Sequence, residues 1–282
     1  SENQSEIIEL KCLLSGQSHN LPNHLKRSIA WFIASAAMMR CHGYKKPISM
    51  LIHASGKVSD HEILTKSVMV WLKFADRSEI ISLIKDLLDS ESKLLNKSNF
   101  LEQLPGYGRN VIQIFDYLPY ESIRNEVNSI LSQISHIGID EDGEIVYHSG
   151  IHVCEDNSNH TFPGEGENNK RVIYPSDEKL ENLNIAPLFV VVGGNTLSRG
   201  LTIEGLVSTY FSRKVRMADT LMQMGRWFGY RRDYELFPRI WMPTDTLDKF
   251  MFLSELDYEL REEIKEMKLL GRVPSEYAPM IK

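Results

Sequence analysis

The chain has 282 residues, of which 42% are hydrophobic, and it carries a formal net charge of -6 at pH 7. This length suffices for one large hydrophobic core, or for one core with a small satellite domain. The acidic balance excludes a protein that coats nucleic acid with its whole surface, because phosphate binding needs clustered lysine and arginine. A local basic groove remains compatible with it. The three cysteines, Cys12, Cys41 and Cys154, are too few and too scattered for a disulfide scaffold.

The sequence carries no pattern that would direct the chain to a membrane. Its N-terminus is acidic and lacks the basic-then-apolar order of a signal peptide. The longest uncharged helical run, residues 29–39, is too short to cross a bilayer. We therefore expect a soluble protein of the reducing cytoplasm, without a membrane partner. The first residue is Ser1 rather than methionine, which suggests a piece of a longer protein.

The first part of the chain predicts a helix, a strand and two further helices. Apolar spacing indicates a helix over residues 22–43. Residues 48–54 form a short β-rich run that is typical of a buried strand. Helices are predicted over 60–74 and 78–95. A strand followed by helices begins an α/β layer, whereas the less regular range 90–185 is interpreted as an insertion or small subdomain.

Regular α/β order returns near residue 186. Residues 188–192 are a continuous apolar run, typical of a central parallel strand that is covered on both faces. Further strands are predicted at 206–211 and 239–242, a helix lies between them at 218–230, and residues 244–270 form one or two helices. We expect the strands, including 48–54, to share one largely parallel sheet with helices on both faces. The predicted fold class is therefore α/β.

Two stretches of the last part carry candidate chemistry. Residues 193–205 form a glycine-rich loop after a buried strand, and open α/β sheets place ligands at the carboxyl ends of their strands. Asn195, Thr196 and Ser198 offer neutral hydrogen-bonding groups that suit phosphate oxygens. The alternative is a glycine-rich turn that only reverses the chain.

The second stretch, residues 223–232, gathers three arginines around two glycines at the end of the predicted helix. Arginine can stabilise the charge that develops on a transferring γ-phosphoryl group. The alternative is a solvated basic helix end, which is favourable beside the helix dipole.

Together, the two stretches resemble motifs V and VI of superfamily 2 helicases. The loop reads S-R-G-L-T-I-x-G and the helix end reads G-R-x-x-G-x-R, where helicases have A-R-G-x-D-x-P and Q-x-x-G-R-x-x-R. The strand at 48–54 with Ser55 occupies the place of motif IV. The sequences GGNTLSRGLTIEGL and QMGRWFGYR most resemble those of the Z-one domain family. This family is labelled as endonucleases and is associated with bacterial restriction-modification and defence operons. The resemblance is sharp over 190–232 and looser over 22–75.

The resemblance implies a RecA-like, P-loop NTPase-type lobe formed by residues 1–89 and 186–282, with 90–185 inserted. It implies roles for individual residues as follows: nucleic-acid contacts by Ser55, Asn195, Thr196, Ser198 and Arg199, nucleotide contacts by Gly200, Thr202 and Gln223, and catalytic contacts by Arg226 and Arg231. Three departures stand out. Thr202 replaces an aspartate that reaches the ATP ribose in many relatives, Arg231 follows Arg226 by five positions rather than three, and Gln223 precedes Gly225 by two rather than three. Ser55, Ser198 and Arg226 are expected near the carboxyl edge of the sheet.

A phosphate-binding loop of the form G-x-x-x-x-G-K-[ST] is missing from the sequence. We therefore expect ATP and Mg²⁺ to be bound mainly by a first, N-terminal lobe of the complete protein, and this chain alone to hydrolyse no ATP. Expected partners are that lobe, nucleic acid with DNA favoured, and restriction-modification subunits. The alternatives are a non-catalytic nucleic-acid-binding or scaffold module of a defence complex, and a nuclease with an unrecognised centre in 90–180.

Two further groups of residues are candidate sites. His148, His152, Cys154 and His160 lack the tight paired spacing of zinc ligands, so that ordinary polar roles are favoured and no metal site is predicted. The triplets 91–93 and 263–265 match the E-x-K letters of a nuclease, but both lie in amphipathic helical context. We interpret both as solvated helix charges.

Overall fold

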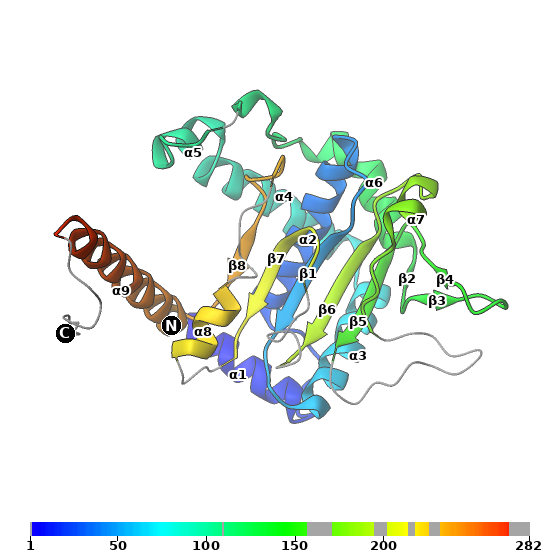
Figure 1. Ribbon diagram of the computed structural model, residues 1–282. Helices are drawn as coiled ribbons and strands as arrows, with labels where there is room; N and C mark the ends of the chain where they lie inside the picture. Colours follow the sequence, from blue (N-terminus) through cyan, green and yellow to red (C-terminus); the bar gives the residue numbers. More distant parts are fainter. Residues whose placement is uncertain are drawn as a thin grey trace.

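The computed structural model describes residues 2–108, 110–156, 171–194, 202–213, 218–225 and 232–270. Its centre is a six-stranded sheet in the order β2-β5-β6-β1-β7-β8, and every neighbouring pair is parallel (Figure 1). The strands are β1 (Ile48–His53), β2 (Ile134–Ser135), β5 (Ile151–Asp156), β6 (Leu188–Gly193), β7 (Leu206–Phe211) and β8 (Arg239–Trp241). The predicted strands 48–54, 188–192, 206–211 and 239–242 are thus confirmed as members of one parallel sheet.

Four strands, β1, β5, β6 and β7, are buried along their whole length. Parallel strands with both faces covered are apolar without interruption, which is why the run at 188–192 was recognisable. In the sheet, Met50 of β1 lies beside Val190 of β6 on one side and Ser208 of β7 on the other. The glycine-rich loop 193–205 therefore joins β6 and β7, the two strands on either side of β1, whereas residues 223–232 precede the edge strand β8 in the chain.

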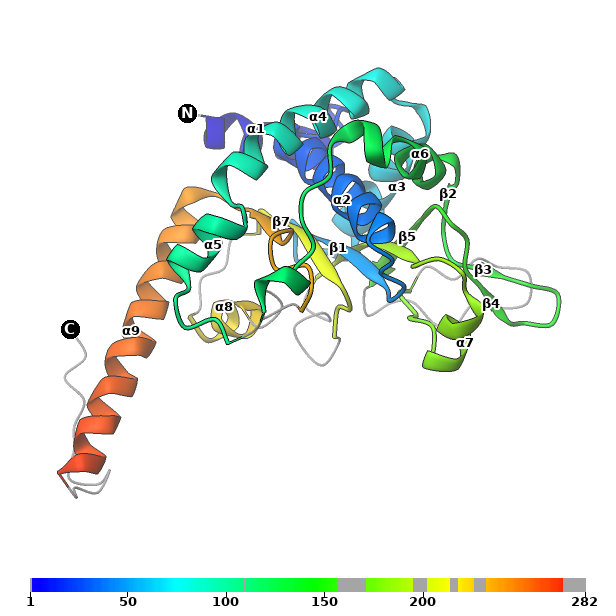
Figure 2. The ribbon, with the colours of Figure 1, turned by 90° about the horizontal axis from the view of Figure 1, so that it is seen from above.

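One face of the sheet is covered by α1 (Glu2–Leu14), α2 (Asn23–Cys41), α3 (Val58–Phe74), α4 (Arg77–Leu94) and α6 (Tyr120–Ser132). Figure 2 shows α2, α3, α4 and α6 together on this side. Helix α2 lies at the centre and is buried continuously from Ser28 to Met39. Its side chains meet those of Met50, Ile52 and Val190 in the larger of two apolar clusters.

Helix α1 was not predicted, and it completes the N-terminus of α2. Pro22 precedes α2 and provides no side-chain cap. The buried carboxylate of Glu6 accepts hydrogen bonds from the backbone N–H groups of His24 (3.0 Å) and Leu25 (3.3 Å) and from the Tyr210 hydroxyl (2.8 Å). A carboxylate satisfies the free N–H groups of a helix end and complements its dipole. This contact joins α1, α2 and β7.

The opposite face is covered more thinly, by α7 (Asp177–Asn182), α8 (Ala218–Gly225) and the start of α9 (Thr244–Leu269) (Figure 2). The second apolar cluster lies here, where Leu221 and Met224 of α8 pack with Leu51, Val191 and Phe211. Helix α9 is one continuous helix that extends away from the sheet (Figure 1). None of the helices in the described ranges combines the length and the apolar content that a bilayer crossing requires.

The range 90–185 contains α5 (Lys97–Gln103), a short 3-10 turn (Val111–Gln113), α6 and an antiparallel hairpin of β3 (Gly138–Ile139) and β4 (Ile145–Val146). This range also contributes β2 and β5 to the main sheet, next to β6. The sequence does not predict either strand there, because β2 is two residues long and β5 carries buried polar side chains that interrupt the apolar pattern. His152 is tolerated inside β5 because its Nδ1 lies 3.0 Å from the Leu188 carbonyl oxygen.

Candidate functional site

The carboxyl edge of the sheet brings the ends of β1, β6 and β7 together. The His53 side chain is fully buried at this edge, and its Nδ1 lies 2.8 Å from the carbonyl oxygen of Gly193. Since a carbonyl only accepts, Nδ1–H is the donor and Nε2 carries a lone pair. Burial lowers the pKa of His53 to about 4, and the nearby Arg213 charge lowers it further against the effect of the Gly193 bond. His53 is therefore neutral at pH 7.

Ser55 lies at the same edge, as predicted, in the turn that leads into α3. Its hydroxyl donates to Oδ2 of Asp60 at 2.6 Å and accepts from the backbone N–H of Lys57 at 3.1 Å. The Ser55 carbonyl accepts from Nε2 of His61 at 2.9 Å. The hydroxyl hydrogen of Ser55 is thus used within the turn, which leaves a remaining lone pair as its contribution to any ligand.

The next loop of the site begins at Gly194, directly after β6. A Cβ atom there would lie 2.6 Å from Cε1 of the His61 ring, so that any larger residue would require the His61 ring to move. The predicted residues Asn195, Thr196, Ser198, Arg199 and Gly200 follow and lie outside the described residues, as do Arg226 and Arg231.

Thr202 lies at the opposite, amino edge of the sheet, because the segment after β6 returns there to begin β7. Gly205 closes this return with φ +59°, and a Cβ atom at this position would lie 1.9 Å from the Pro47 carbonyl oxygen. Ser55 and Thr202 are thus separated by the length of β1. The expected nucleic-acid contact and the expected nucleotide contact fall on two different edges.

Thr202 lines a cavity of about 730 Å³ at the amino edge. The other lining residues are Gly43, Tyr44, Lys45, Lys46, Pro47, Phe115, Ile203, Glu204, Gly205, Arg232, Asp233 and Tyr234. Three cations and three aromatic rings therefore share this space with two carboxylates. Such a lining suits a ligand that has both an aromatic ring and anionic groups.

The aromatic part of the cavity is pre-packed. The Tyr44 ring meets Tyr234 edge-on at 5.4 Å and Phe115 at 6.3 Å between centroids. Burial, helped by the neighbouring Tyr234, raises the pKa of Tyr44 above its usual range. Burial also raises the pKa of Glu204, while Lys46 acts against this shift. The three rings thus pack against one another beside the opening.

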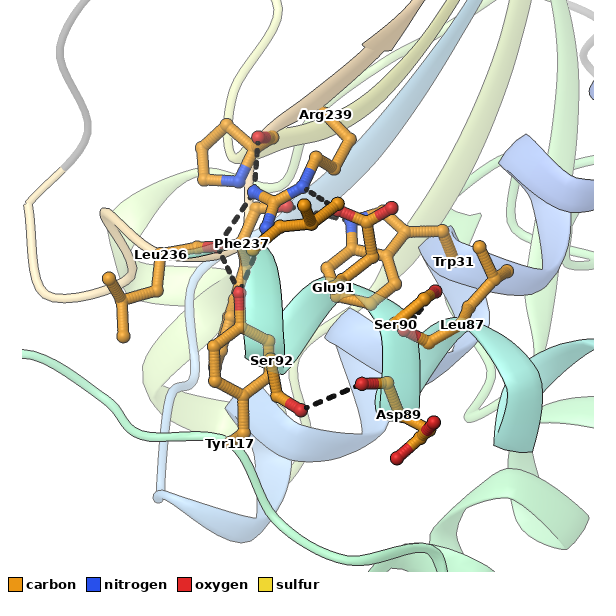
Figure 3. A network of polar contacts seen from close by, with 12 residues as sticks. Trp31, Leu87, Asp89, Ser90, Glu91, Ser92, Tyr117, Leu236, Phe237 and Arg239 are labelled. Carbon is orange, nitrogen blue, oxygen red and sulfur yellow. Dashed lines mark hydrogen bonds and ion pairs between the residues drawn. The ribbon is translucent and has the colours of Figure 1, made fainter. Parts of the chain in front are cut away.

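The segment from Arg232 to β8 is anchored by Arg239 (Figure 3). The Arg239 guanidinium lies over the Trp31 ring at 5.2 Å and forms an ion pair with Glu91 at 2.6 Å. It also donates to the Tyr117 hydroxyl at 2.9 Å and to the carbonyl oxygens of Leu236 and Pro238. Our interpretation of Glu91 as a solvated helix charge is wrong, because its side chain is only 17% exposed and binds β8.

The family model of the Z1 domain matches residues 24–282. The chain belongs to the Z1 domain family. No match was found among curated proteins or among solved structures. The matched range of this Z1 domain includes both sheet edges and the whole of 90–185, so that the cavity and the carboxyl-edge cluster are parts of the family's domain.

In this Z1 domain, Gln223 is exposed on α8 between the buried Leu221 and Met224. It is therefore placed on the outer side of the helix that leads to Arg226. Arg213, at the carboxyl end of β7, was missed by sequence analysis because a lone arginine after a strand carries no motif. Its guanidinium lies 3.5 Å from Nε2 of His53.

The histidine cluster of this Z1 domain is part of the core. His148 and His152 stack with ring centroids 3.9 Å apart, and Nε2 of His148 lies 2.8 Å from the Ser135 hydroxyl. Cys154 is fully buried, which raises the pKa of its thiol. Within the described ranges, no group of three or more His, Cys, Asp or Glu side chains is arranged to hold a metal ion. His160 lies outside these ranges.

Proposed function

We propose that this Z1 domain is the second, RecA-like lobe of a superfamily 2 helicase-type, nucleic-acid-dependent ATPase, acting in a bacterial restriction-modification or defence system. The observation that carries the proposal is that two segments far apart in the sequence line the same cavity. Thr202 comes from the motif V-like loop and Arg232 directly follows the motif VI-like stretch, yet both line the cavity at the amino edge.

The lining of the cavity fits the nucleotide that such a lobe would face. Lys45, Lys46 and Arg232 supply positive charge for phosphate oxygens, and Tyr44 and Phe115 supply ring faces and edges for a base. Thr202 offers a hydroxyl where many helicases have a carboxylate, so that it can hydrogen-bond a ribose without adding charge.

In this proposal, nucleic acid and nucleotide are bound at opposite edges of the parallel sheet. The carboxyl edge, where Ser55 and Gly194 lie, would face nucleic acid, and the amino edge would face the nucleotide. Arg226 and Arg231 precede Arg232 of the cavity in the chain and would contact the γ-phosphate across the cleft as arginine fingers, while a first lobe holds most of the ATP and its Mg²⁺. The proposal thus places Arg226 toward the amino edge rather than at the carboxyl edge expected from the sequence. Closure of the two lobes on ATP would assemble the site, and hydrolysis would release it.

The experiment is a comparison of ATP hydrolysis by the protein that carries the nucleotide-binding lobe and by residues 1–282 alone, each with and without DNA. We expect DNA-stimulated, Mg²⁺-dependent turnover from the former and none from the latter. Arg232→Ala in the complete protein should raise the KM for ATP more than it lowers kcat, since it removes binding charge. Lys249→Ala on the exposed part of α9 is the matched control and should change neither.

Two results would contradict the proposal. Turnover by residues 1–282 that is lost on changing one of their own side chains would place a complete site in this chain. A complete protein that binds DNA and never hydrolyses ATP would favour a non-catalytic binding or scaffold module.

A further inference from the structure

The carboxyl end of β7 carries a cation that is held in place by β1. The backbone N–H groups of Ser212 and Arg213 both donate to the His53 carbonyl oxygen, at 3.2 and 3.3 Å. Beyond the backbone, Nη1 of Arg213 lies 3.5 Å from Nε2 of His53. His53 thus contacts Arg213 twice, at its backbone N–H and at its guanidinium.

The orientation of the guanidinium follows from the protonation of His53. Nδ1–H of His53 is committed to the Gly193 carbonyl, so that Nε2 presents a lone pair toward Arg213. A charged imidazole would present a hydrogen there and repel the guanidinium. Burial of His53, by lowering its pKa to about 4, keeps the ring in the accepting form at neutral pH.

Gly56 gives the guanidinium its space. A Cβ atom on Gly56 would lie 3.2 Å from Nη2 and 3.3 Å from Cζ of Arg213. The flat guanidinium therefore packs against bare backbone at the start of the turn before α3. The exposed Lys57 is the next residue, directly before the first turn of α3, where free N–H groups and the helix dipole favour an anion.

We propose that Arg213 and Lys57 bind a phosphate group of a nucleic-acid backbone at the carboxyl edge, and that His53 is the positioning residue that aims Arg213. The ligand's identity as nucleic acid rests on the proposed function, whereas the site itself rests on these contacts. A planar guanidinium that is preoriented by its neighbours binds a phosphate with two parallel hydrogen bonds and little loss of side-chain freedom. The partial burial that lowers the pKa of Arg213 strengthens its attraction for such an anion.

The test is direct binding of a labelled single-stranded DNA of about 20 nucleotides to residues 1–282 without ATP, followed by fluorescence anisotropy over about 50 to 200 mM salt. Arg213→Ala should weaken binding roughly tenfold, in line with the loss of a charge-assisted hydrogen-bonding pair. It should also lower the slope of log affinity against log salt by about 1. Lys57→Ala should act in the same direction with a smaller loss of affinity.

Arg261→Ala is the matched control, because Arg261 has the same charge but its side chain is 70% exposed on α9. It should leave the affinity and the salt slope unchanged. Arg213→Gln is measured beside Arg213→Ala, since it keeps the aliphatic stem of the side chain and a polar end while removing the charge. Thermal unfolding of each variant checks that it is folded at the temperature of the binding assay.

The role of His53 is tested by two variants that both remove its buried imidazole ring. His53→Gln keeps an acceptor oxygen within reach of Arg213, and His53→Leu does not. The proposal expects His53→Gln to retain most of the salt slope and His53→Leu to lose about the same share as Arg213→Ala. Equal slopes for the two would make His53 a purely structural residue.

Three results would overturn the site. The first is that the wild-type chain does not bind the DNA. The second is that Arg213→Ala, like Arg261→Ala, leaves the affinity and the salt slope unchanged. The third is that ATP displaces the DNA from the wild-type chain but not from Arg213→Ala. The last result would assign Arg213 to a free nucleotide. Because the assay needs neither hydrolysis nor the first lobe, its failure is distinguishable from a failure of the proposed ATPase.

Discussion

Glu91 of α4 and Arg239 of β8 form an ion pair with 2.6 Å between Oε2 and Nε, and both side chains are less than 20% exposed. The pair joins a helix of the larger cluster to the edge strand of the sheet. Since β8 follows the segment that lines the amino-edge cavity, the same contact holds the end of that segment against α4 and, through Trp31, against α2.

Glu91→Ala should destabilise the fold by roughly 2 kcal/mol, because it leaves the partly buried Arg239 without its carboxylate. The free energy of urea unfolding measures this. Glu121→Ala is the control, since Glu121 is 73% exposed and lies 3.9 Å from Lys85. An exposed pair of this kind contributes at most about 1 kcal/mol. Equal losses from the two variants would show that the Glu91 contact is not energetically distinct.

Gly205→Ala should destabilise the protein by about 3 kcal/mol or more. The new Cβ would overlap the Pro47 carbonyl, and φ +59° is itself strained for alanine. Gly106→Ala, where nothing lies within 4 Å and φ is not positive, should change stability by less than about 0.5 kcal/mol. A Gly205→Ala variant that unfolds at the wild-type urea concentration would mean that the chain does not return to the amino edge as described.

Stability should fall as the pH is lowered below about 6.5. Burial lowers the pKa of His152 to about 3, with the neighbouring His148 adding to the shift. The folded state therefore keeps this ring neutral, whereas the unfolded chain protonates it near its ordinary value of about 6.5. The stabilisation is fully present above that pH and is lost as the pH falls towards the folded-state value.

His152→Phe tests this linkage. The variant should be less stable than the wild type at pH 7.5, because it loses the bond to the Leu188 carbonyl. Between pH 7.5 and 5.5, however, it should lose about 1.4 kcal/mol less unfolding free energy than the wild type does. An unchanged pH dependence would indicate that His152 is protonated in the folded protein at the same pH as in the unfolded chain.

The central strands were predictable because a strand that is buried on both faces consists of consecutive apolar residues. Residues 188–192 can be recognised as a strand from their own apolar sequence. Strand β5 cannot, because its buried His152 is accommodated by a hydrogen bond to the Leu188 carbonyl of the neighbouring strand β6. Helix α1 is similar, because Glu6 serves as a cap for a helix that begins at Asn23 and as a partner of Tyr210. Contacts across such distances in sequence leave no local pattern.

The candidate site was predictable in part. The motif-like loop after β6 made Thr202 a candidate, and the structure shows that Thr202 lines a cavity. The place of Ser55 at the carboxyl edge followed from its position after a strand. The division into two edges did not follow, because it depends on Gly205 packing against Pro47. Arg213 was missed for a related reason, since its orientation comes from His53 at the end of another strand.

The measurement that tests the central claim most directly is single-turnover ATP hydrolysis by the complete protein with Arg226→Ala, together with its ATP affinity. We expect the rate to fall by about 10³- to 10⁵-fold while the affinity is largely kept, because an arginine finger acts mainly on charge in the transition state. Arg226→Lys should rescue little, since an ammonium cannot replace the planar fork. Hydrolysis by Arg226→Ala at the wild-type rate would contradict the account and leave the motif VI-like stretch as a basic helix end.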